Sequence, residues 1–361
     1  MNQSTIPIGP HRVGPTEPPF IIAELSANHA GSLETALEIV RAAADHGAHA
    51  IKLQTFTPET LSIDSTRPEF FINDPDSLWH GRRLWELYEE AQTPWKWHAP
   101  LFDAARERGL ACISSAFDQS SVDFLACLGA DAIKIASFEL VHLPLIEVAA
   151  KTGLPLILST GMGSLEEIDE AVTAIRRIGC EDFVLLKCTS AYPAREEDAN
   201  TLAIPDLRAR YDCQVGLSDH TLKPFAAYSA VALGATMIEK HLTIRRADGA
   251  LDSAFSMEPA DLADLVDGTR LVWLSRGAVS YGCRPTEETS RKERPSIYAV
   301  KPIAAGEALT TDNIRVIRPG AGLAPKHFSE LIGRRARKEV PAETPLSWSL
   351  LEPAASEEGN A

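Results

Sequence analysis

Short apolar runs recur between Phe20 and Thr243, and each run ends in polar or charged residues. Every run is too short, and too rich in Ile, Val and Leu, for a surface helix, and this pattern is typical of strands that are buried on both faces. The eight runs are FIIAELSAN from Phe20, AIKLQT from Ala50, ACISSAF from Ala111, AIKIASFE from Ala132, PLILSTG from Pro155, FVLLKCTS from Phe183, QVGLSDH from Gln214 and MIEKHLT from Met237.

Amphipathic segments with helical spacing lie between the runs. The clearest are residues 32–47, 121–129, 164–179 and 225–234. Glycines follow their apolar faces, and serines stand at plausible N-caps of the first and third. Because strand and helix alternate eight times, the pattern predicts an α/β protein with a (β/α)₈ TIM barrel. An open, doubly wound sheet is the main alternative.

The chain has 361 residues, which is more than one barrel needs, so a second domain is expected. A polar, charged segment that starts near Tyr281 is typical of a linker, and short β-like segments separated by Gly, Pro and Asn follow it. The predicted parts are an N-terminal arm (1–19), a barrel (20–280), a linker (281–294), a small domain (295–352) and a disordered tail (353–361).

Composition narrows the function classes. The chain is 45% hydrophobic and 24% charged, as in ordinary soluble proteins, and its net charge of −15 argues against a nucleic-acid partner. No apolar stretch is long enough to span a membrane, and the start lacks the features of a signal peptide, so a cytoplasmic location without a membrane partner is expected. The six cysteines form no CxxC pair, which favours buried thiols over disulfides or a zinc site.

A long insertion, residues 57–98, follows the second predicted strand and carries Trp79, Trp85, Trp95 and Trp97. An insertion on that side of a barrel lies over its active face. The tryptophans either form a lid that contacts substrate or pack the insertion onto the barrel rim.

Two lysines stand inside apolar runs, Lys52 in AIKLQT and Lys134 in AIKIAS. A buried ammonium group is costly unless an anion meets it, so both predict a site for phosphate or carboxylate at the barrel mouth. The STGMGS segment places backbone N–H groups ahead of a helix, which also suits an anion. Neutral hydroxyl donors near other strand ends are Ser114, Ser115, Ser137, Ser159, Thr160, Ser190 and Ser218.

His220 and His241 end the seventh and eighth runs, which are neighbours in a barrel. Both imidazoles could then hold one divalent ion and leave positions open for water and a substrate oxygen. The alternative is a pair of hydrogen-bonded core histidines. Candidates for acid–base catalysis or for binding hydroxyl groups are Glu24, Glu139, Glu239 and Asp252, while Asp219 is a candidate for orienting a histidine.

At these residues the sequence resembles the sialic acid synthase family, whose members condense phosphoenolpyruvate with an amino sugar. The resemblance covers AELSANHAGSLETALEIVRAAADHGAHAIKLQT, KIASFEL, LSTGMGSLEEI, GLSDHT, EKHLT and the C-terminal VIRPGAGL, which is similar to the family's antifreeze-like (SAF) domain. The start ELSANH, in place of a more usual EIGVNH type, LWELYEEAQTPWKWH and GALDSAFSMEP are similar to the pseudaminic acid synthase branch. That branch uses 2,4-diacetamido-2,4,6-trideoxy-L-altrose.

The resemblance implies a role for individual residues. It assigns phosphoenolpyruvate to Lys52, Ser115, Lys134, Ser137, Ser159, Gly161, Ser190 and Ser218. It assigns the sugar to Gln54, Glu139, Tyr192, Asp252 and Arg318, proton transfer to Glu24, and a divalent ion (Mn²⁺, Mg²⁺ or Co²⁺) to His220 and His241. Arg318 would reach the site of the opposite subunit in a domain-swapped homodimer. At Ser190 many N-acetylneuraminate synthases carry Asn, which weakens transfer of that branch's sugar preference.

These groups imply a carbon–carbon bond-forming transferase. A divalent ion on the two histidines makes the sugar aldehyde electrophilic, and carbon 3 of phosphoenolpyruvate attacks it. Water adds at carbon 2, and phosphate leaves beside fixed cations. The alternatives are an N-acetylneuraminate or legionaminate synthase, a lyase-type aldolase with a Schiff base on Lys134 or Lys187, and a sugar-binding or ice-binding module. The polar and charged residues at the eight strand ends argue against a sugar-binding or ice-binding module.

Overall fold

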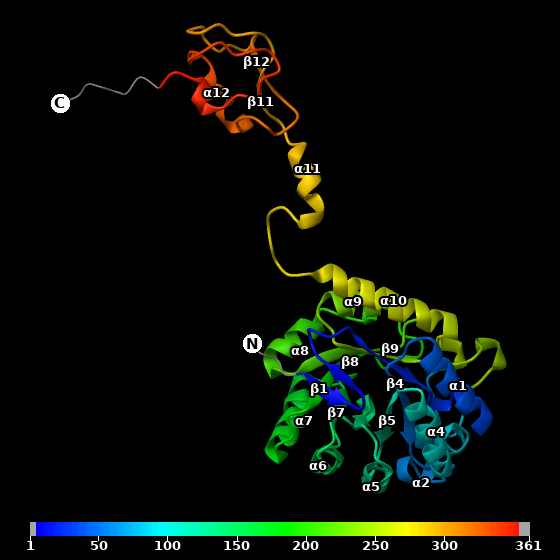
Figure 1. The fold of residues 1–361 in the computed structure, drawn as a ribbon. Coiled ribbons are helices and arrows are strands. Elements are labelled where there is room, and N and C mark those ends of the chain that lie inside the picture. The colour runs from blue at the N-terminus through cyan, green and yellow to red at the C-terminus, as the bar shows by residue number, and fades with distance from the viewer. Residues whose placement is uncertain (1–4, 354–361) are drawn as a thin grey trace. The chain divides into compact units, whose positions relative to one another are not determined.

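The computed structural model describes residues 5–353, and the chain divides into two compact units, Met1–Gly277 and Ala278–Ala361 (Figure 1). The first four residues of the predicted arm and residues 354–361 of the predicted tail lie outside the described residues.

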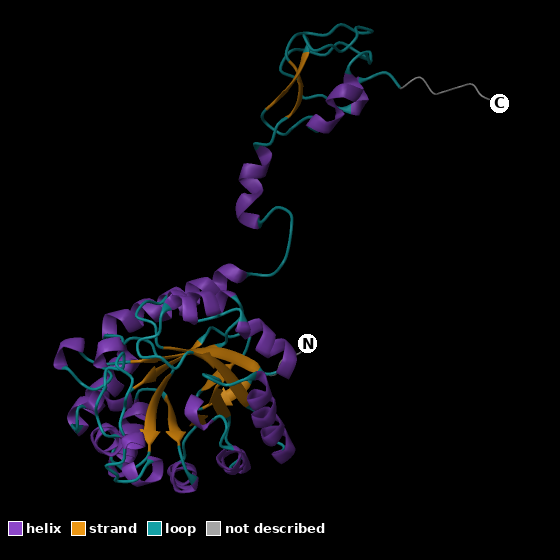
Figure 2. Ribbon diagram, turned by 180° about the vertical axis from the view of Figure 1, so that it is seen from behind, coloured by secondary structure: helices purple, strands orange, loops and turns teal. Residues whose placement is uncertain are grey.

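Eight parallel strands in the first unit close into a barrel, with helices around the outside (Figure 2). This confirms the predicted (β/α)₈ barrel and excludes the open sheet. Each predicted run contains one barrel strand. The strands are β3 (Phe20–Glu24), β4 (Ala50–Thr55), β5 (Ala111–Ala116), β6 (Ala132–Ile135), β7 (Leu156–Ser159), β8 (Phe183–Cys188), β9 (Gln214–Asp219) and β10 (Met237–His241).

A helix follows every barrel strand. Ser32 and Ser164 cap the first and fifth of these helices as predicted, and their side chains accept from Thr35 N and Glu167 N. The third helix begins before residue 121, because Asp118 caps it. The barrel helices are α1 (Leu33–Asp45), α4 (Trp95–Glu107), α5 (Gln119–Leu128), α6 (Leu143–Lys151), α7 (Leu165–Ile178), α8 (Ala203–Tyr211), α9 (Phe225–Ala232) and α10 (Pro259–Arg276).

Alternate strand residues belong to two separate hydrophobic clusters. On β8, Val184 and Leu186 belong to the cluster inside the barrel, whereas Leu185 belongs to the larger cluster between the strands and the helices. This alternation is the two-residue repeat of an extended strand. Since it continues to the end of each strand, it decides which polar side chains enter the barrel mouth.

A short hairpin packs against the interior cluster. Its strands are β1 (Ile6–Ile8) and β2 (His11–Val13), and Ile6, Ile8 and Val13 are buried with the inward residues at the start of the barrel strands. The hairpin therefore covers the end of the barrel where the strands begin, and substrates are left with the opposite end.

The insertion after β4 is shorter than predicted. Helix α4 begins at Trp95 and packs against α1 and β5, so residues 95–98 belong to the barrel's own helix layer. The rings of Trp95 and Phe124 lie 4.7 Å apart, and those of Trp97 and His29 lie 5.5 Å apart. These two tryptophans pack the barrel, and the true insertion carries only α2 (Pro58–Leu61), a turn at 68–70 and α3 (Leu84–Ala91).

The second unit has a small core of its own. Strands β11 (Ser296–Ala299) and β12 (Ile314–Ile317) pair antiparallel, and α12 (Phe328–Leu331) adds Leu331 to their apolar side chains. The segment predicted as a linker contains a short helix, α11 (Glu288–Lys292).

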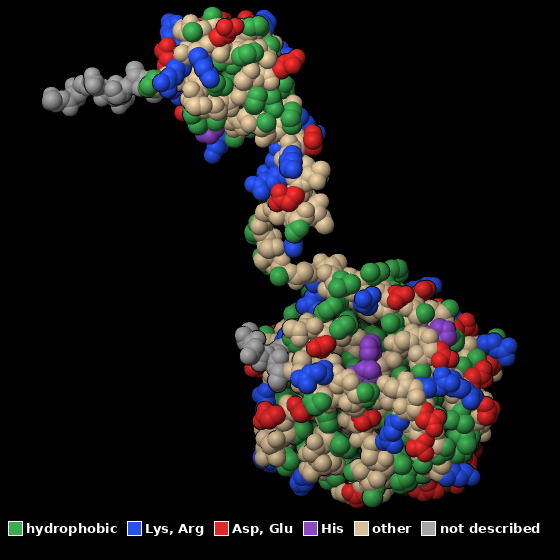
Figure 3. Space-filling view, in the orientation of Figure 1, with side chains coloured by type: hydrophobic (Ala, Val, Ile, Leu, Met, Phe, Trp, Pro, Cys, Tyr) green, Lys and Arg blue, Asp and Glu red, His purple; other side chains and the backbone are tan. Residues whose placement is uncertain are grey.

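The described residues contain no membrane-spanning helix, and charges of both signs lie on one face of the barrel (Figure 3). Among residues 5–353, no helix combines the length and the apolar character of a membrane span. Acidic and basic side chains are interspersed on the barrel face drawn in Figure 3. The cysteines are free, with Cys112, Cys188 and Cys213 buried and Cys127 exposed.

Two histidines, buried His98 and half-buried His49, predict that the barrel loses stability in mild acid. His49 Nδ1 accepts from Ile21 N, His98 Nε2 lies 2.8 Å from Thr55 Oγ1, and burial lowers the pKa of each to about 4. Because these pKa values lie below the unfolded value of 6.5, the stabilisation is complete above pH 6.5 and is lost as the pH falls towards 4. The expected loss is about 3 kcal/mol per histidine at pH 4.

Thermal melting between pH 7 and pH 4.5 measures this effect. His98→Gln keeps a polar group near Thr55 but cannot be protonated, so its melting temperature should fall less steeply with pH than that of the wild type. Equal slopes for the two proteins would show that His98 is not a source of acid sensitivity.

Candidate active site

Polar and charged side chains occupy the inward positions at the carboxyl ends of the barrel strands. They share the two-residue phase of the interior cluster, and nearly all are buried. The inward set is Glu24, Lys52, Gln54, Ser115, Lys134, Ser159, Ser218, Glu239 and His241, with His220 directly after β9.

Lys52 is the centre of a buried charge cluster. Its Nζ lies 2.6 Å from Glu24 Oε2 and 3.5 Å from Glu239 Oε1, and donates to Ser115 Oγ at 3.1 Å. Burial would lower the pKa of Lys52, but Glu239 and Glu24 outweigh it and the pKa rises. Burial raises the pKa of Glu24, whereas for Glu239 the cations Lys52 and Lys134 outweigh burial and lower the pKa. Of the two carboxyl groups, Glu24 is the one that more readily takes up a proton.

Lys134 is a second buried cation, 2% exposed. Its Nζ donates to Ser159 Oγ at 2.7 Å and to the carbonyl oxygen of Ile135 at 2.9 Å. Burial lowers the pKa of Lys134, Glu239 opposes this, and Lys52 adds to it. An anion beside Lys134 would hold it in the charged form.

The loops after β6, β7 and β8 meet at Gly161. Gly161 N donates to Ser137 Oγ at 3.1 Å, and a Cβ at this position would lie 2.7 Å from Ser137 Oγ and still closer to Ser190 Oγ. Only glycine leaves room for both hydroxyl groups. The result is a cradle of small donors beside Lys134, which suits phosphate oxygens.

His220 and His241 face each other across the mouth, with ring centroids 5.3 Å apart. His220 Nδ1 lies 2.9 Å from the carbonyl oxygen of Thr189, so in the neutral imidazole Nδ1 carries the proton and the lone pair of Nε2 is left for a ligand. Burial would lower the pKa of His220, but Cys188 and the bond to Thr189 outweigh it and the pKa rises. His241 Nδ1 has no hydrogen-bond partner among the described residues and lies 3.8 Å from Asp252 Oδ2. Burial lowers the pKa of His241 well below its ordinary value, and His220 adds to this, so His241 is neutral.

Aromatic rings form the wall beside the histidines. The ring of Tyr192 lies 4.5 Å from that of His220, 5.4 Å from Phe255 and 5.9 Å from Trp79. Trp79 comes from the insertion after β4, so the insertion does reach the mouth of the barrel. Trp79 therefore lies beside Tyr192, which is predicted to bind the sugar, whereas Trp95 and Trp97 pack the barrel.

Two further residues that are predicted to bind the sugar lie at the mouth of the barrel. Gln54 Nε2 donates to Glu24 Oε1 at 3.1 Å. Glu139 follows β6 in a turn, and burial raises its pKa to about 7, with Lys134 opposing. Arg318 is exposed in the second unit, so its assignment to the sugar stays a prediction.

The structure gives three of the residues suggested from the sequence partners away from the barrel mouth. Ser114 faces outward and bonds to Thr55 Oγ1 at 2.7 Å. Thr160 Oγ1 donates to the backbone of Leu186. Asp219 pairs with Lys240 at 3.0 Å outside the barrel, so it does not orient a histidine.

Cys188 is a site residue that the sequence reasoning missed. It ends β8 on the inward face, with Sγ 4.0 Å from His220 Nδ1. Burial would raise the pKa of Cys188, but His220 and Ser137 outweigh it and the pKa falls to about 7. Counting in steps of two from Val184 would have identified this position as inward.

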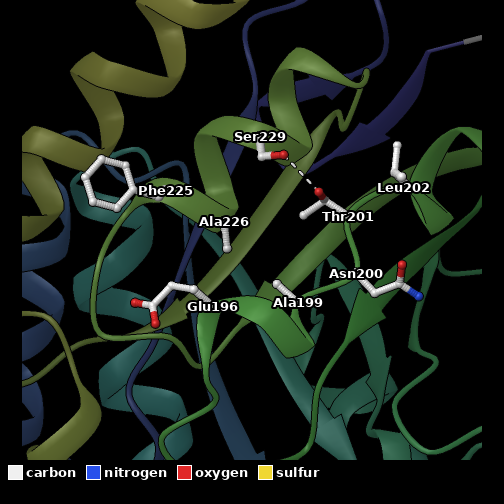
Figure 4. Close-up of a pocket in the computed structure, with 8 residues that line it drawn as sticks. All are labelled: Glu196, Ala199, Asn200, Thr201, Leu202, Phe225, Ala226 and Ser229. Atoms are coloured by element: carbon white, nitrogen blue, oxygen red, sulfur yellow. Dashed lines mark hydrogen bonds between the residues drawn. The ribbon is translucent and has the colours of Figure 1, made fainter.

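A hollow of about 330 Å³ lies outside this cluster, between residues 196–202, which precede α8, and α9 (Figure 4). Thr201 and Ser229 bond across it, and Phe225 and Leu202 expose apolar surface beside it. Glu196 is its single charged lining residue, so it lacks the convergent cations and imidazoles of the barrel mouth.

Comparisons with known proteins agree with this arrangement. Residues 39–281 match the NeuB family, and residues 294–352 match the SAF domain. A pseudaminic acid synthase from Helicobacter pylori is 42% identical over 332 residues, covering 92% of this chain and 97% of the relative. One from Campylobacter jejuni is 41% identical over 324 residues, covering 89% of this chain and 93% of the relative.

A solved structure of a sialic acid synthetase is also similar to this chain. The crystal structure of an N-acetylneuraminic acid synthetase from Leptospira borgpetersenii, in complex with citrate, is 32% identical and has a TM-score of 0.71, covering 80% of this chain and 95% of that chain. Since the family match spans more than half of the sequence and the relatives align along nearly their full length, this chain belongs to the NeuB family.

Proposed function

We propose that the protein condenses phosphoenolpyruvate with 2,4-diacetamido-2,4,6-trideoxy-L-altrose to give pseudaminic acid and phosphate. The observation that carries the proposal is the pairing of two buried lysines, ringed by hydroxyl donors, with two facing imidazoles across one barrel mouth. The pseudaminic acid synthases from Helicobacter pylori and Campylobacter jejuni, each more than 40% identical, support this sugar over N-acetylneuraminate precursors.

The lysine side of the mouth suits phosphoenolpyruvate. Lys134 with Ser159, and the cradle of Ser137, Gly161 and Ser190, provide charge-assisted and neutral donors for carboxylate and phosphate oxygens. These donors are fixed by strand ends before the substrate arrives, so they stabilise phosphate as it departs without reorganisation.

Glu24 is the residue that we propose for proton transfer. An anion beside Lys52 competes with Glu24 for the same ammonium group, which adds to the effect of burial and favours the protonated carboxyl. A protonated Glu24 can then donate to the sugar oxygen that becomes a hydroxyl when carbon 3 of phosphoenolpyruvate attacks the aldehyde.

His220 and His241 fit a divalent ion such as Mn²⁺. His220 is held in the tautomer that exposes Nε2, and His241 is neutral with an unpartnered Nδ1. Among residues 5–353, no group of three or more His, Cys, Asp or Glu is arranged as a metal site, so substrate and water would complete the ligand set. When bound, the ion would act as a Lewis acid on the aldehyde.

Phosphate release with a panel of amino sugars tests the function. The diacetamido sugar should give the largest kcat/KM, with N-acetylmannosamine and the legionaminic acid precursor lower, and mass spectrometry should identify the nine-carbon acid. Phosphoenolpyruvate labelled with ¹⁸O at the bridging oxygen should deliver the label to phosphate, because water attacks carbon 2. A preference for N-acetylmannosamine would instead support an N-acetylneuraminate synthase.

We also propose a domain-swapped homodimer in which Arg318 completes the sugar site of the opposite subunit. The second unit has a small core, so docking on a partner surface would stabilise it, and the exposed guanidinium of Arg318 is available for charge-assisted hydrogen bonds there. His220→Ala and Arg318→Ala proteins should each be nearly inactive. After co-refolding, half of the dimers are mixed and each has one intact site, so about a quarter of the wild-type activity should return. Mixed dimers without recovery would place Arg318 elsewhere.

A further inference from the structure

Ser26 has a backbone conformation that is unusual for its residue type. It lies two residues after the end of β3 with a φ of 47°, in the left-handed region that favours glycine, and its side chain is buried, with 3% of the residue exposed. A non-glycine residue persists in such a conformation only when its surroundings over-determine it, and such residues cluster at functional sites.

The Ser26 hydroxyl joins two residues of the candidate site. It donates to Asp252 Oδ2, which also accepts from Ala27 N at 3.4 Å, and it accepts from Gln54 Nε2 at 3.0 Å. The second hydrogen of Gln54 Nε2 goes to Glu24 Oε1 at 3.1 Å. One hydroxyl group therefore links β4 to the loop after β10.

These bonds fix which atoms face a ligand. Because both Nε2 hydrogens of Gln54 are used, the amide cannot rotate without losing them, and Oε1 is the atom left to accept. Oδ1 is likewise the oxygen of Asp252 that Ser26 and Ala27 leave available. The pair thus presents two acceptors, which match N–H and O–H donors such as those of an acetamido sugar.

We propose that Ser26 is a positioning residue for the amino sugar: its strained backbone holds the hydroxyl that locks Gln54 and Asp252 as paired acceptors for the sugar's amide and hydroxyl hydrogens. Phosphoenolpyruvate should not be affected, because the Ser26 side chain bonds to Gln54 and Asp252 and to none of the donors proposed for phosphoenolpyruvate. The inference rests on the proposed function, since it assigns Ser26 to the sugar.

Ser26→Gly separates this role from a merely structural one. Glycine relieves the backbone strain while deleting the hydroxyl, so the melting temperature should stay within about 3 °C of the wild type. The kcat/KM for the diacetamido sugar should fall about tenfold to a hundredfold, mainly through KM, and the KM for phosphoenolpyruvate should not change. Ser26→Ala should show the same kinetic loss with a lower melting temperature, because the strain remains.

Ala30 provides the matched control. It has a φ of 46° in the same turn, is exposed, and lacks a polar side chain. Ala30→Gly should relieve similar strain and leave both kinetic constants unchanged. Unchanged sugar kinetics in Ser26→Gly, or equal changes in the KM for both substrates, would overturn the inference. Calorimetric titration of the wild type with the sugar separates the two failures: absent binding overturns the proposed function as well, whereas wild-type binding that Ser26→Gly retains overturns the role of Ser26 alone.

Discussion

Replacing Lys134 with methionine is expected to lower kcat/KM for phosphoenolpyruvate about a thousandfold, because a buried anion would lose the cation that pairs with it at a cost of about 4 kcal/mol. The loss should appear in the KM for phosphoenolpyruvate more than in the KM for the sugar. Lys134 lies on the interior face with Ser159 Oγ at 2.7 Å, among the donors proposed for phosphoenolpyruvate, and of the residues predicted to bind the sugar only Glu139 follows the same strand.

Lys187 is the matched control for this substitution. It is half-buried on β8, but the strand alternation directs it outward, where Nζ donates to the backbone of Cys188 at 2.7 Å and to Thr189 Oγ1 at 3.2 Å. Lys187→Met should therefore retain nearly full kcat/KM. A severe loss in Lys187→Met alone, or trapping of either lysine by borohydride with pyruvate, would point to the lyase-type aldolase instead.

His241→Ala is expected to abolish metal binding and to reduce turnover by at least about a thousandfold, since a Lewis acid contributes several kcal/mol to such a reaction. The fold should survive. His241 Nδ1 has no hydrogen-bond partner among the described residues, so truncation leaves no hydrogen bond of that atom broken. Metal content after dialysis against Mn²⁺, measured by calorimetry or mass spectrometry, gives a result that is independent of activity.

His98→Ala should behave in the opposite way. His98 is also a buried neutral histidine, but it bonds to Thr55 in the helix layer. Its loss should lower the melting temperature and leave metal content at the wild-type level. Chelation of the wild type should abolish activity, and Mn²⁺ should restore it. Full activity after exhaustive EDTA treatment would contradict the metal role of His220 and His241.

Many candidate site residues could be predicted because they are polar or charged residues within apolar strands. Lys52, Lys134 and His241 are charged or polar residues in otherwise apolar strands, and the cost of burying such groups marks them in the sequence. The same sequence does not say which neighbouring hydroxyl faces inward. Ser114 and Ser115 look alike as letters, and only their opposite faces separate a core hydroxyl from a site hydroxyl.

The contacts within the mouth could not be read from the sequence, because they join residues that are far apart in the chain. Ser26 and Asp252 are 226 residues apart and share a hydrogen bond. Trp79 meets Tyr192 across the mouth, while Trp95 and Trp97, close to it in the sequence, pack the barrel wall. The spacing of the tryptophans in the sequence does not show which of them reaches the barrel mouth and which pack the barrel wall.

The sequence by itself determined the alternation of eight strands and helices, since it follows from local hydrophobic spacing and turn residues, whereas the structure showed that the strands close into a barrel. It also indicated where the charged site lies, because a charge inside an apolar strand is costly unless an ion of opposite charge meets it. The tertiary structure alone decided the tautomer of His220, the rise in the pKa of Glu24 and the strained turn at Ser26. All three features depend on burial and on partners brought from distant strands. A residue's neighbours in the chain determine neither its burial nor these partners.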